Sequence, residues 1–376
     1  MRMIRKAALF ALIISLILVM VSFAAEDVRI GLVTPLTGDV ATFGESTRNA
    51  AQMWVDETNA KGGLLGGKVV LFVEDDRNIP AETANAVSKL ISQNKVITVV
   101  GSVASKCTLA GAPIAQSSKV PMITPTSTNV TVTQVGDYIF RACFIDPFQG
   151  TVMARYAYQN LKAKTAAMLY DIGNDYTKGL AENFKKSFEQ LGGKVVASET
   201  YGVGESDFSA QLTNIRTAKP DVLFLPDYYN SVGLQARQAR QLGITATFLG
   251  GDGWDSSELV PIAGTAIEGG MFSNHYAPGS SDPIAQAFYT NYIKRYGSAP
   301  DALAALAYDA FIIVGNAVTK AGKLDKTAIR DAIATTKDLH AVSGVLTFDA
   351  NRNPIKGAVI LEVKGGKFVY RDTVNP

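Results

Sequence analysis

The chain has 376 residues, of which 47% are apolar and 19% are charged, with 36 Lys and Arg against 34 Asp and Glu. This length suits two or three domains, and the composition excludes disordered, collagen-like and coiled-coil proteins. The net charge of +2 comes without a basic stripe, so nucleic acid is not an expected partner. Two His and two Cys leave little material for a protein-built zinc site or for acid–base chemistry on histidine.

The N-terminus has the pattern of a secretory signal peptide. Three cations precede an apolar run over residues 7–23, and small residues stand at Ser22 and Ala24, the positions that a signal peptidase reads. We expect cleavage after Ala24, with Ala25 as the second choice, so that residues 1–24 are lost and the net charge falls to −1. The alternative is an uncleaved anchor, because the run approaches a short transmembrane span. No other apolar run long enough to cross a bilayer is expected.

Two cysteines remain in the exported chain. Cys107 and Cys143 would occupy a compartment that permits disulfides. The sequence leaves their pairing open, because it does not show whether their Cα atoms lie within bonding reach. A reactive catalytic cysteine is disfavoured, since no histidine is placed as its base.

Apolar strands alternate with amphipathic helices in the first third of the chain. In the second of these helices, which Pro80 opens, Ala84, Val87 and Ile91 form the expected apolar stripe. Strands that are apolar throughout, each followed by a helix, indicate a parallel sheet covered on both faces. The expected strands are 28–33, 68–74, 96–100 and 120–123, and the other helices are 46–61 and 108–117.

The same pattern restarts after residue 147. Segments 82–105 and 207–230 both run through a helix, a short loop, an apolar strand and a polar loop, which predicts two copies of one α/β architecture. The expected helices of the second copy are 148–161, 176–191, 207–217 and 231–242, and its strands are 166–170, 194–199, 222–225 and 247–249. Helices at 283–296, 301–321 and 326–335 and strands at 345–348 and 358–363 complete the prediction.

Polar loops follow the strands of the first half. In open α/β sheets, ligands bind beyond the carboxyl ends of the strands. The loops at 101–105 and 124–128 both place hydroxyls and backbone N–H groups there, and a following helix dipole attracts anions. A carboxylate is the ligand group that suits such loops. The alternative is that Ser105 and Thr128 are only helix caps.

Acids and aromatic residues follow the strands of the second half. Asp252 lies in a Gly-rich loop that ends in Trp254, and Tyr228 and Tyr229 follow the preceding strand. These residues, opposite a carboxylate-binding loop, suit an amino acid as the ligand. The acid would receive the ammonium group, and the rings would cover the side chain. The alternative for Asp252 is a turn residue between glycines. Asp227 and Asp309 are the reserve acids, and Trp254 and Tyr229 belong either to the pocket or to packing.

Several longer motifs carry a family resemblance. They are GLVTPLTG at 31–38, NAKGGL at 59–64, the acid pair at 75–76, GSVAS at 101–105, PMITP at 121–125, DY at 175–176, RQAR at 237–240 and YDA at 308–310. Through them the chain resembles the periplasmic leucine/isoleucine/valine-binding protein family, the solute receptors of branched-chain amino-acid ABC transporters. The resemblance covers residues 28 to about 363.

The resemblance implies a type I periplasmic-binding-protein fold, with two Rossmann-like α/β lobes joined by a three-stranded hinge. The lobes would comprise residues 26–145 plus 278–341 and residues 146–277 plus 342–376. We place the three crossings of the chain near 144–147, 274–278 and 340–344. Such a hinge allows closure around a ligand.

The resemblance also implies roles for individual residues. Ser105 and Thr128 match the residues that hold the ligand carboxylate, and Thr126 matches one that gives backbone contacts. Tyr176 matches a tyrosine that closes over the ligand, and Tyr228 matches the tyrosine of the next polar loop.

Asp252 matches the acid that takes the ammonium, although the best-known members carry Glu there, so its reach is one methylene shorter. Phe43 stands where they carry Tyr and lacks that hydroxyl. Val103 and Ala104 keep the pocket partly apolar. The two departures weaken the expectation that the ligand is leucine.

The expected function is that of an extracytoplasmic receptor, not an enzyme, which binds a branched-chain or other apolar amino acid and delivers it to an ABC permease. It is expected to be a monomer without a cofactor or metal. The alternative is a sensor or receptor of the same fold for an amide, urea or another amino acid.

Enzyme functions find little support in the sequence. The stretch at 62–68 has the spacing of a phosphate-binding loop, but Val69 replaces the required Ser or Thr and the loop joins a helix to a strand. No nucleophile–base set of a hydrolase occurs. His275 and His340 fall near the expected crossings and are expected to be structural.

Overall fold

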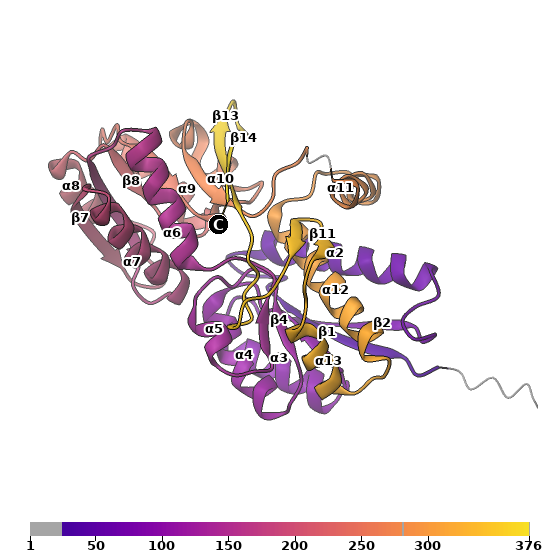
Figure 1. Ribbon diagram of the computed structural model, residues 1–376. Coiled ribbons are helices and arrows are strands. Elements are labelled where there is room, and N and C mark those ends of the chain that lie inside the picture. The colour runs from indigo at the N-terminus through magenta and orange to yellow at the C-terminus, as the bar shows by residue number, and fades with distance from the viewer. Residues whose placement is uncertain (1–24, 280–281, 376) are drawn as a thin grey trace, which may run out of the picture.

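The computed structural model describes residues 25–279 and 282–375, so the predicted signal peptide lies outside the described residues. The first lobe is built on a parallel five-stranded sheet (Figure 1). Its strand order is β2-β1-β3-β4-β5, that of a doubly wound α/β sheet. The strands are β1 (Val28–Thr34), β2 (Val69–Asp75), β3 (Thr98–Val100), β4 (Met122–Thr124) and β5 (Ile139–Arg141).

Helices cover both faces of this sheet. Ile30 and Leu32 of β1 pack with Trp54 of α2 and Phe311 of α12, whereas Val33, which points the other way, packs with α3 and α4. The predicted two-faced burial is therefore confirmed. The helices of this lobe are α2 (Ala41–Ala60), α3 (Pro80–Ser92), α4 (Ser105–Ser117), α5 (Thr131–Gln134), α11 (Pro283–Tyr296), α12 (Ala302–Ala321) and α13 (Lys326–Ala334).

The second lobe is built on a seven-stranded sheet with the order β14-β13-β10-β9-β8-β6-β7. Its parallel part, β7-β6-β8-β9-β10, repeats the strand order of the first lobe, which confirms the prediction of two copies of one architecture. β13 and β14 extend the sheet in antiparallel fashion. The strands are β6 (Thr165–Asp171), β7 (Lys194–Tyr201), β8 (Val222–Phe224), β9 (Thr247–Gly250), β10 (Met271–Asn274), β13 (Ala358–Lys364) and β14 (Lys367–Val374).

The helices of the second lobe lie between these strands in the sequence. They are α6 (Asp146–Arg155), which continues as a π-helical turn (Tyr156–Asn160), α7 (Asp175–Gln190), α8 (Ser209–Ala218), α9 (Tyr229–Gln241) and α10 (Leu259–Ala263). Short 3-10 turns at Asp252–Trp254 and Gly264–Ile267 complete this lobe. A small hairpin of β11 (Leu339–Ala341) and β12 (Gly344–Leu346) follows α13.

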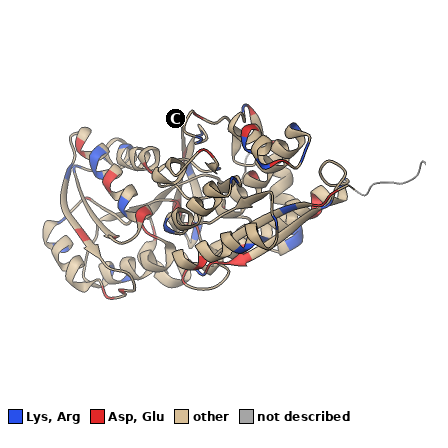
Figure 2. Cartoon of the chain, turned by 90° about the horizontal axis from the view of Figure 1, so that it is seen from below, with Lys and Arg blue, Asp and Glu red and all other residues tan. Residues whose placement is uncertain are grey.

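The chain passes from one sheet to the other more than once. It leaves the first sheet after β5, returns after β10 to form α11, α12 and α13, and then enters the second sheet again as β13 (Figure 1). The lobe boundaries and the three-stranded hinge stay predictions. In the view of Figure 2, charges of both signs are interspersed over the helices, which fits the small net charge.

One expectation about apolar segments is wrong. α12 is long and apolar enough to span a membrane by length and composition, but 78% of its apolar window is buried inside the protein. It is a core helix of the first lobe, where it packs on α2 and α13.

Several predicted elements differ in detail. α2 begins at Ala41, five residues before the prediction. The buried stripe of α3 contains Val87 as predicted, but its other members are Thr83, Ala86 and Leu90. β5, β10 and β14 were not predicted from the sequence: β5 ends in Arg141, β10 ends in Ser273 and Asn274, and β14 is mostly exposed, so none of them presents an unbroken apolar run.

Candidate functional site

A cavity between the two lobes brings together seven of the nine predicted site residues. It measures about 20 Å³, which is room for roughly one water molecule. Ala104 and Thr128 are buried nearby but do not line it. The lining residues are Phe43, Val103, Ser105, Thr126, Tyr176, Tyr228, Asp252, Gly253 and Leu303.

The loop that follows β3 forms the wall on the first lobe. A Cβ at Gly101 would lie 2.1 Å from the main-chain oxygen of Val33, and the φ of Gly101 is +121°, so only glycine fits this turn. The Ser102 hydroxyl donates to the buried carboxylate of Asp76 at 2.5 Å. These two features direct the chain into the first turn of α4 at Ser105.

The second loop of this wall is hydrogen-bonded to the first. Thr126 Oγ1 and Ser127 Oγ both donate to the main-chain oxygen of Val103, at 2.9 and 3.0 Å. The buried guanidinium of Arg141 supports this loop from behind, donating to the oxygens of Ser127 and Asn129 at 2.6 and 2.7 Å. The two loops are thus fixed relative to each other.

Neither predicted hydroxyl acts as a helix cap. The N-cap of α4 is Ala104, and Ser105 is the first helical residue. The Oγ of Ser105 accepts from the main-chain N–H of Asn129 at 3.3 Å. Thr128 lies before the N-cap of α5, which is Val130, and its buried hydroxyl has no hydrogen-bond partner of good geometry among the described residues. The N-terminal amides and the dipole of α4 therefore adjoin the Ser105 hydroxyl, an arrangement that suits an anion, whereas the Thr128 hydroxyl lies close to the Asp146 carboxylate.

Asp252 supplies the acid of the opposite wall. Its Oδ1 accepts from Gln149 Nε2 at 2.7 Å and from the Tyr176 hydroxyl at 2.9 Å, and its Oδ2 lies 3.1 Å from His275 Nε2. Burial and the charge of Asp252 raise the pKa of Tyr176 well above its usual value. Burial lowers the pKa of His275 to about 4, although Asp252 opposes this shift.

Two of these partners were missed by sequence reasoning. Gln149 lies in the first turns of α6, and His275, expected to be structural, directly follows β10. Leu303, near the start of α12, was also missed. The one sequence signal for Gln149 was its position as a polar residue in the first turns of a predicted helix.

Aromatic rings cover the cavity. The rings of Tyr176 and Tyr228 stack with centroids 5.2 Å apart and an interplanar angle of 8°. The ring of Phe43, from the first lobe, makes an edge-to-face contact with that of Tyr228, with the ring centroids 5.9 Å apart. Together with Val103 and Leu303, these rings give the cavity an apolar side opposite its polar loops.

The undecided aromatic residues turn out to pack outside the cavity. Trp254 is fully buried, and its Nε1 donates to the main-chain oxygen of Leu225 at 2.9 Å. The hydroxyl of Tyr229 donates across the lobes to the oxygen of Asp39 at 3.3 Å. Neither side chain lines the cavity.

The reserve acids are engaged elsewhere. Asp227 accepts from the hydroxyl of Tyr201, and burial raises the pKa of Asp227 to about 7. Asp309 accepts from the amides of Val342 and Ser343 at 2.6 and 3.1 Å. Of the three candidate acids, Asp252 alone lines the cavity.

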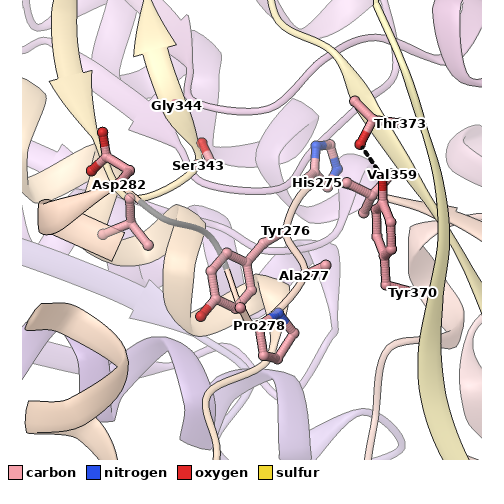
Figure 3. A pocket seen from close by; sticks show the side chains of 12 residues that line it. His275, Tyr276, Ala277, Pro278, Asp282, Ser343, Gly344, Val359, Tyr370 and Thr373 are labelled. Atoms are coloured by element: carbon pink, nitrogen blue, oxygen red, sulfur yellow. Dashed lines mark hydrogen bonds between the residues drawn. The ribbon is translucent and has the colours of Figure 1, made fainter. Parts of the chain in front are cut away.

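A larger cavity of about 400 Å³ lies beside the chain segments that join the lobes. Figure 3 shows Tyr276 and Pro278 on one side of it and the hydrogen-bonded pair Tyr370 and Thr373 on the other. His275 also lines this cavity. It holds none of the predicted site residues, so the small cavity between the lobes is the better candidate despite its size.

The cysteines and possible metal ligands add no further site. Cys107 and Cys143 are free and buried, with their Sγ atoms 3.7 Å from Asn78 Oδ1 and 3.3 Å from the oxygen of Ser127. Across residues 25–279 and 282–375, no group of three or more His, Cys, Asp or Glu side chains is arranged to hold a metal ion.

A binding cleft between two doubly wound lobes defines a class of solute receptors. The sequence profile described as "Periplasmic binding protein" matches residues 27–367. The chain belongs to this family, within its group of leucine/isoleucine/valine-binding proteins, and has the type I fold.

Individual relatives support this assignment. A Leu/Ile/Val-binding protein of Rhizobium johnstonii is 34% identical over 86% of this chain and 88% of its own. A leucine-binding protein from Thermotoga maritima is 40% identical, with a TM-score of 0.89 over 93% of this chain and 99% of its own. A branched-chain amino acid transporter substrate-binding protein from Streptococcus pneumoniae, solved with isoleucine, is 34% identical, with a TM-score of 0.88 over 93% of this chain and 100% of its own.

Proposed function

We propose that the protein is an extracytoplasmic receptor that binds an amino acid with an apolar side chain between its lobes and delivers it to an ABC permease. The observation that carries the proposal is the position of Asp252. A buried acid on one lobe faces the N-terminus of α4 and its hydroxyls on the other lobe, across a cavity with an apolar side. A zwitterion needs partners for both of its charges when it leaves water.

The proposed roles follow from this arrangement. The hydroxyls of Ser105 and Thr128, with the first amides of α4, hold the ligand carboxylate. The main chain at Thr126 adds contacts to the ligand. Asp252 receives the ammonium, and its remaining lone pairs are available because a carboxylate accepts about four hydrogen bonds.

The apolar side of the cavity takes the ligand side chain. Phe43, Val103, Ala104, Tyr176 and Tyr228 form or support this side, and all of them are at most 9% exposed. The relatives named for leucine, isoleucine and valine support a branched aliphatic ligand. A cavity with room for about one water requires the lobes to separate before such a molecule enters.

The proposed delivery to a permease is based on the family to which the chain belongs. The relatives include a substrate-binding protein of a branched-chain amino acid transporter, and the predicted signal peptide would export the chain. As in the sequence-based expectation, the chain would act as a monomer and without catalysis. The second candidate function is a sensor or receptor of the same fold for another small polar solute.

Mass spectrometry of the molecule released from freshly purified, unfolded protein tests the proposal most directly, because tightly bound solutes survive purification. We expect leucine, isoleucine or valine, and calorimetry with a panel of amino acids should give the tightest binding for the same molecule. Tightest binding of an amide or urea, with no amino acid bound, would instead establish the second candidate function.

A further inference from the structure

His275 contacts the carboxylate of Asp252 at the candidate site and lines the larger cavity beside the segments that join the lobes. Its Nε2 lies 3.1 Å from Asp252 Oδ2, and the side chain is 1% exposed. The ring stacks on Phe144 with centroids 3.6 Å apart and an interplanar angle of 28°. His275 directly follows β10 and Phe144 lies between β5 and α6, so the pair joins two of the segments that pass between the sheets.

The hydrogen bonds of the ring define its tautomer. Nδ1 is buried and has no hydrogen-bond partner among the described residues. A proton on Nδ1 would be an unsatisfied buried donor, whereas a proton on Nε2 is shared with a carboxylate. The ring is therefore neutral, with its proton on Nε2, and it donates to Asp252.

The charged surroundings of the ring are defined by several elements. Asp252 lies on the 3-10 turn after β9, and Lys356 faces the ring from the segment before β13, where its Nζ donates to Ser343 Oγ at 2.5 Å. Cys143 and Asp146, on either side of Phe144, are also within range of Asp252 or Lys356. Of these groups, Asp252 is the one in direct contact with the ring.

We propose that His275 is a positioning residue, which holds the Asp252 carboxylate toward the ligand ammonium and ties it to the segments that join the lobes. This inference rests on the proposed function. Gln149 and Tyr176 bind Oδ1 alone, so without His275 the second oxygen is free to rotate away from the ligand. A doubly protonated ring would place a cation against Asp252 and compete with the ammonium.

The test compares two substitutions and one control by calorimetry with L-leucine at pH 7.5. H275L removes the donor, and we expect leucine binding to weaken about 10- to 100-fold, the range for a hydrogen bond to a charged group. H275Q places an amide nitrogen close to the position of Nε2 and should bind leucine within about threefold of wild type. H340Q alters the exposed second histidine and should change nothing.

A deaminated probe separates positioning from general damage to the fold. Binding of 2-hydroxy-4-methylpentanoate, which lacks the ammonium, should weaken less than about threefold in H275L. Equal losses for both probes, or H275Q as weak as H275L, would overturn the proposal. So would unchanged leucine binding in H275L, whereas a wild-type protein that binds no amino acid would overturn the proposed function itself.

The ring nitrogens of wild type give a reading that does not depend on whether H275L or H275Q folds. With two histidines in the chain, the ¹⁵N signals of wild type are assigned by comparison with H340Q. We expect the Nε2–H tautomer from pH 5.5 to 8 in the leucine complex. A proton on Nδ1, or a ring protonated at pH 6, would overturn the proposal.

Discussion

The side-chain amide of Asn129 donates to the main-chain oxygen of Asp175 at 2.7 Å, and these residues come from opposite lobes. The hydroxyls of Thr42 and Ser256 make a second such contact at 3.0 Å. The lobes therefore contact each other directly at two separate points. The structure corresponds to a closed arrangement, in which the walls of the candidate site already face each other.

Closure should depend on the ligand. The predicted hinge and the small size of the cavity mean that the empty protein must open before an amino acid enters. Small-angle scattering should show a smaller radius of gyration when leucine is added to ligand-free wild type. The D252N variant at the same leucine concentration should keep the larger radius. A radius that leucine leaves unchanged at saturation would contradict closure.

The two hydroxyls near α4 should contribute to binding and little to folding. Ser105→Ala and Thr128→Ala should each weaken amino-acid binding by about 1.5–3 kcal/mol, the range for hydrogen bonds to charged groups. Calorimetry and thermal unfolding check this. Ser117→Ala, at the exposed end of the same helix, is the control. Variants that bind normally but melt earlier would show that these hydroxyls are structural.

Removing the charge of Asp252 should weaken amino-acid binding more than removing either hydroxyl. Asp252→Asn leaves the ligand ammonium buried without an anion, which costs about 3–5 kcal/mol, so amino-acid binding should weaken at least about 100-fold. Calorimetry with leucine and its deaminated analogue shows whether the loss of affinity is confined to the ligand that carries an ammonium group. Asp227→Asn, outside the cavity, is the matched control. Equal losses for both ligands would assign Asp252 to loop structure.

Asp146 should make stability depend on pH. It is fully buried, neither carboxylate oxygen has a hydrogen-bond partner of good geometry among the described residues, and burial raises its pKa to about 8. Between pH 4 and 8 the folded state binds a proton that the unfolded state releases, so stability falls as pH rises.

Thermal unfolding tests this between pH 6.5 and 8, where the contributions of His275, Asp227 and Lys356 are common to wild type and Asp146→Asn and cancel in the comparison. Wild type should lose more stability over that range than Asp146→Asn, which mimics the protonated acid. Asp207→Asn, at an exposed site whose hydrogen bonds to Ser209 lower the pKa, should behave like wild type. Equal pH dependence in wild type and Asp146→Asn would mean that Asp146 is ionised throughout.

Both thiols should be free and unreactive. Cys107 and Cys143 are buried, and burial raises the pKa of each to about 12. A thiol reagent should therefore label neither in the native protein and both after denaturation without reductant. Absence of labelling in denaturant would reveal a disulfide.

The alternation of apolar strands and helices was enough to predict most strands of both sheets and their repeat. Local pattern fixes the central strands because they are buried on both faces, whereas β2, β7 and β14 at the sheet edges are only partly buried or exposed. The start of α2 was predicted too late, since residues 41–45 include no apolar stripe of their own and Phe43 packs at the contact between the lobes, against Tyr228 and Tyr229.

The candidate site was predictable where its residues stand in loops directly after strands, as Ser105 and Asp252 do. Gln149, His275 and Leu303 could not be found in this way. They come from three elements far apart in the sequence: the fold of the second lobe brings Gln149 and His275 to Asp252, and the contact between the lobes brings Leu303 to the cavity. Their positions depend on tertiary packing that no local pattern records.

The size of the closed cavity has a kinetic consequence. With room for about one water, it has no space for an amino acid while the contacts of Asn129 and Thr42 hold the lobes together, so entry and release of the proposed ligand both require the lobes to separate. Release then proceeds no faster than the lobes separate, whatever the solute. A membrane partner that pulls the lobes apart would set the rate of discharge by its own mechanical action, independently of how tightly each amino acid is held.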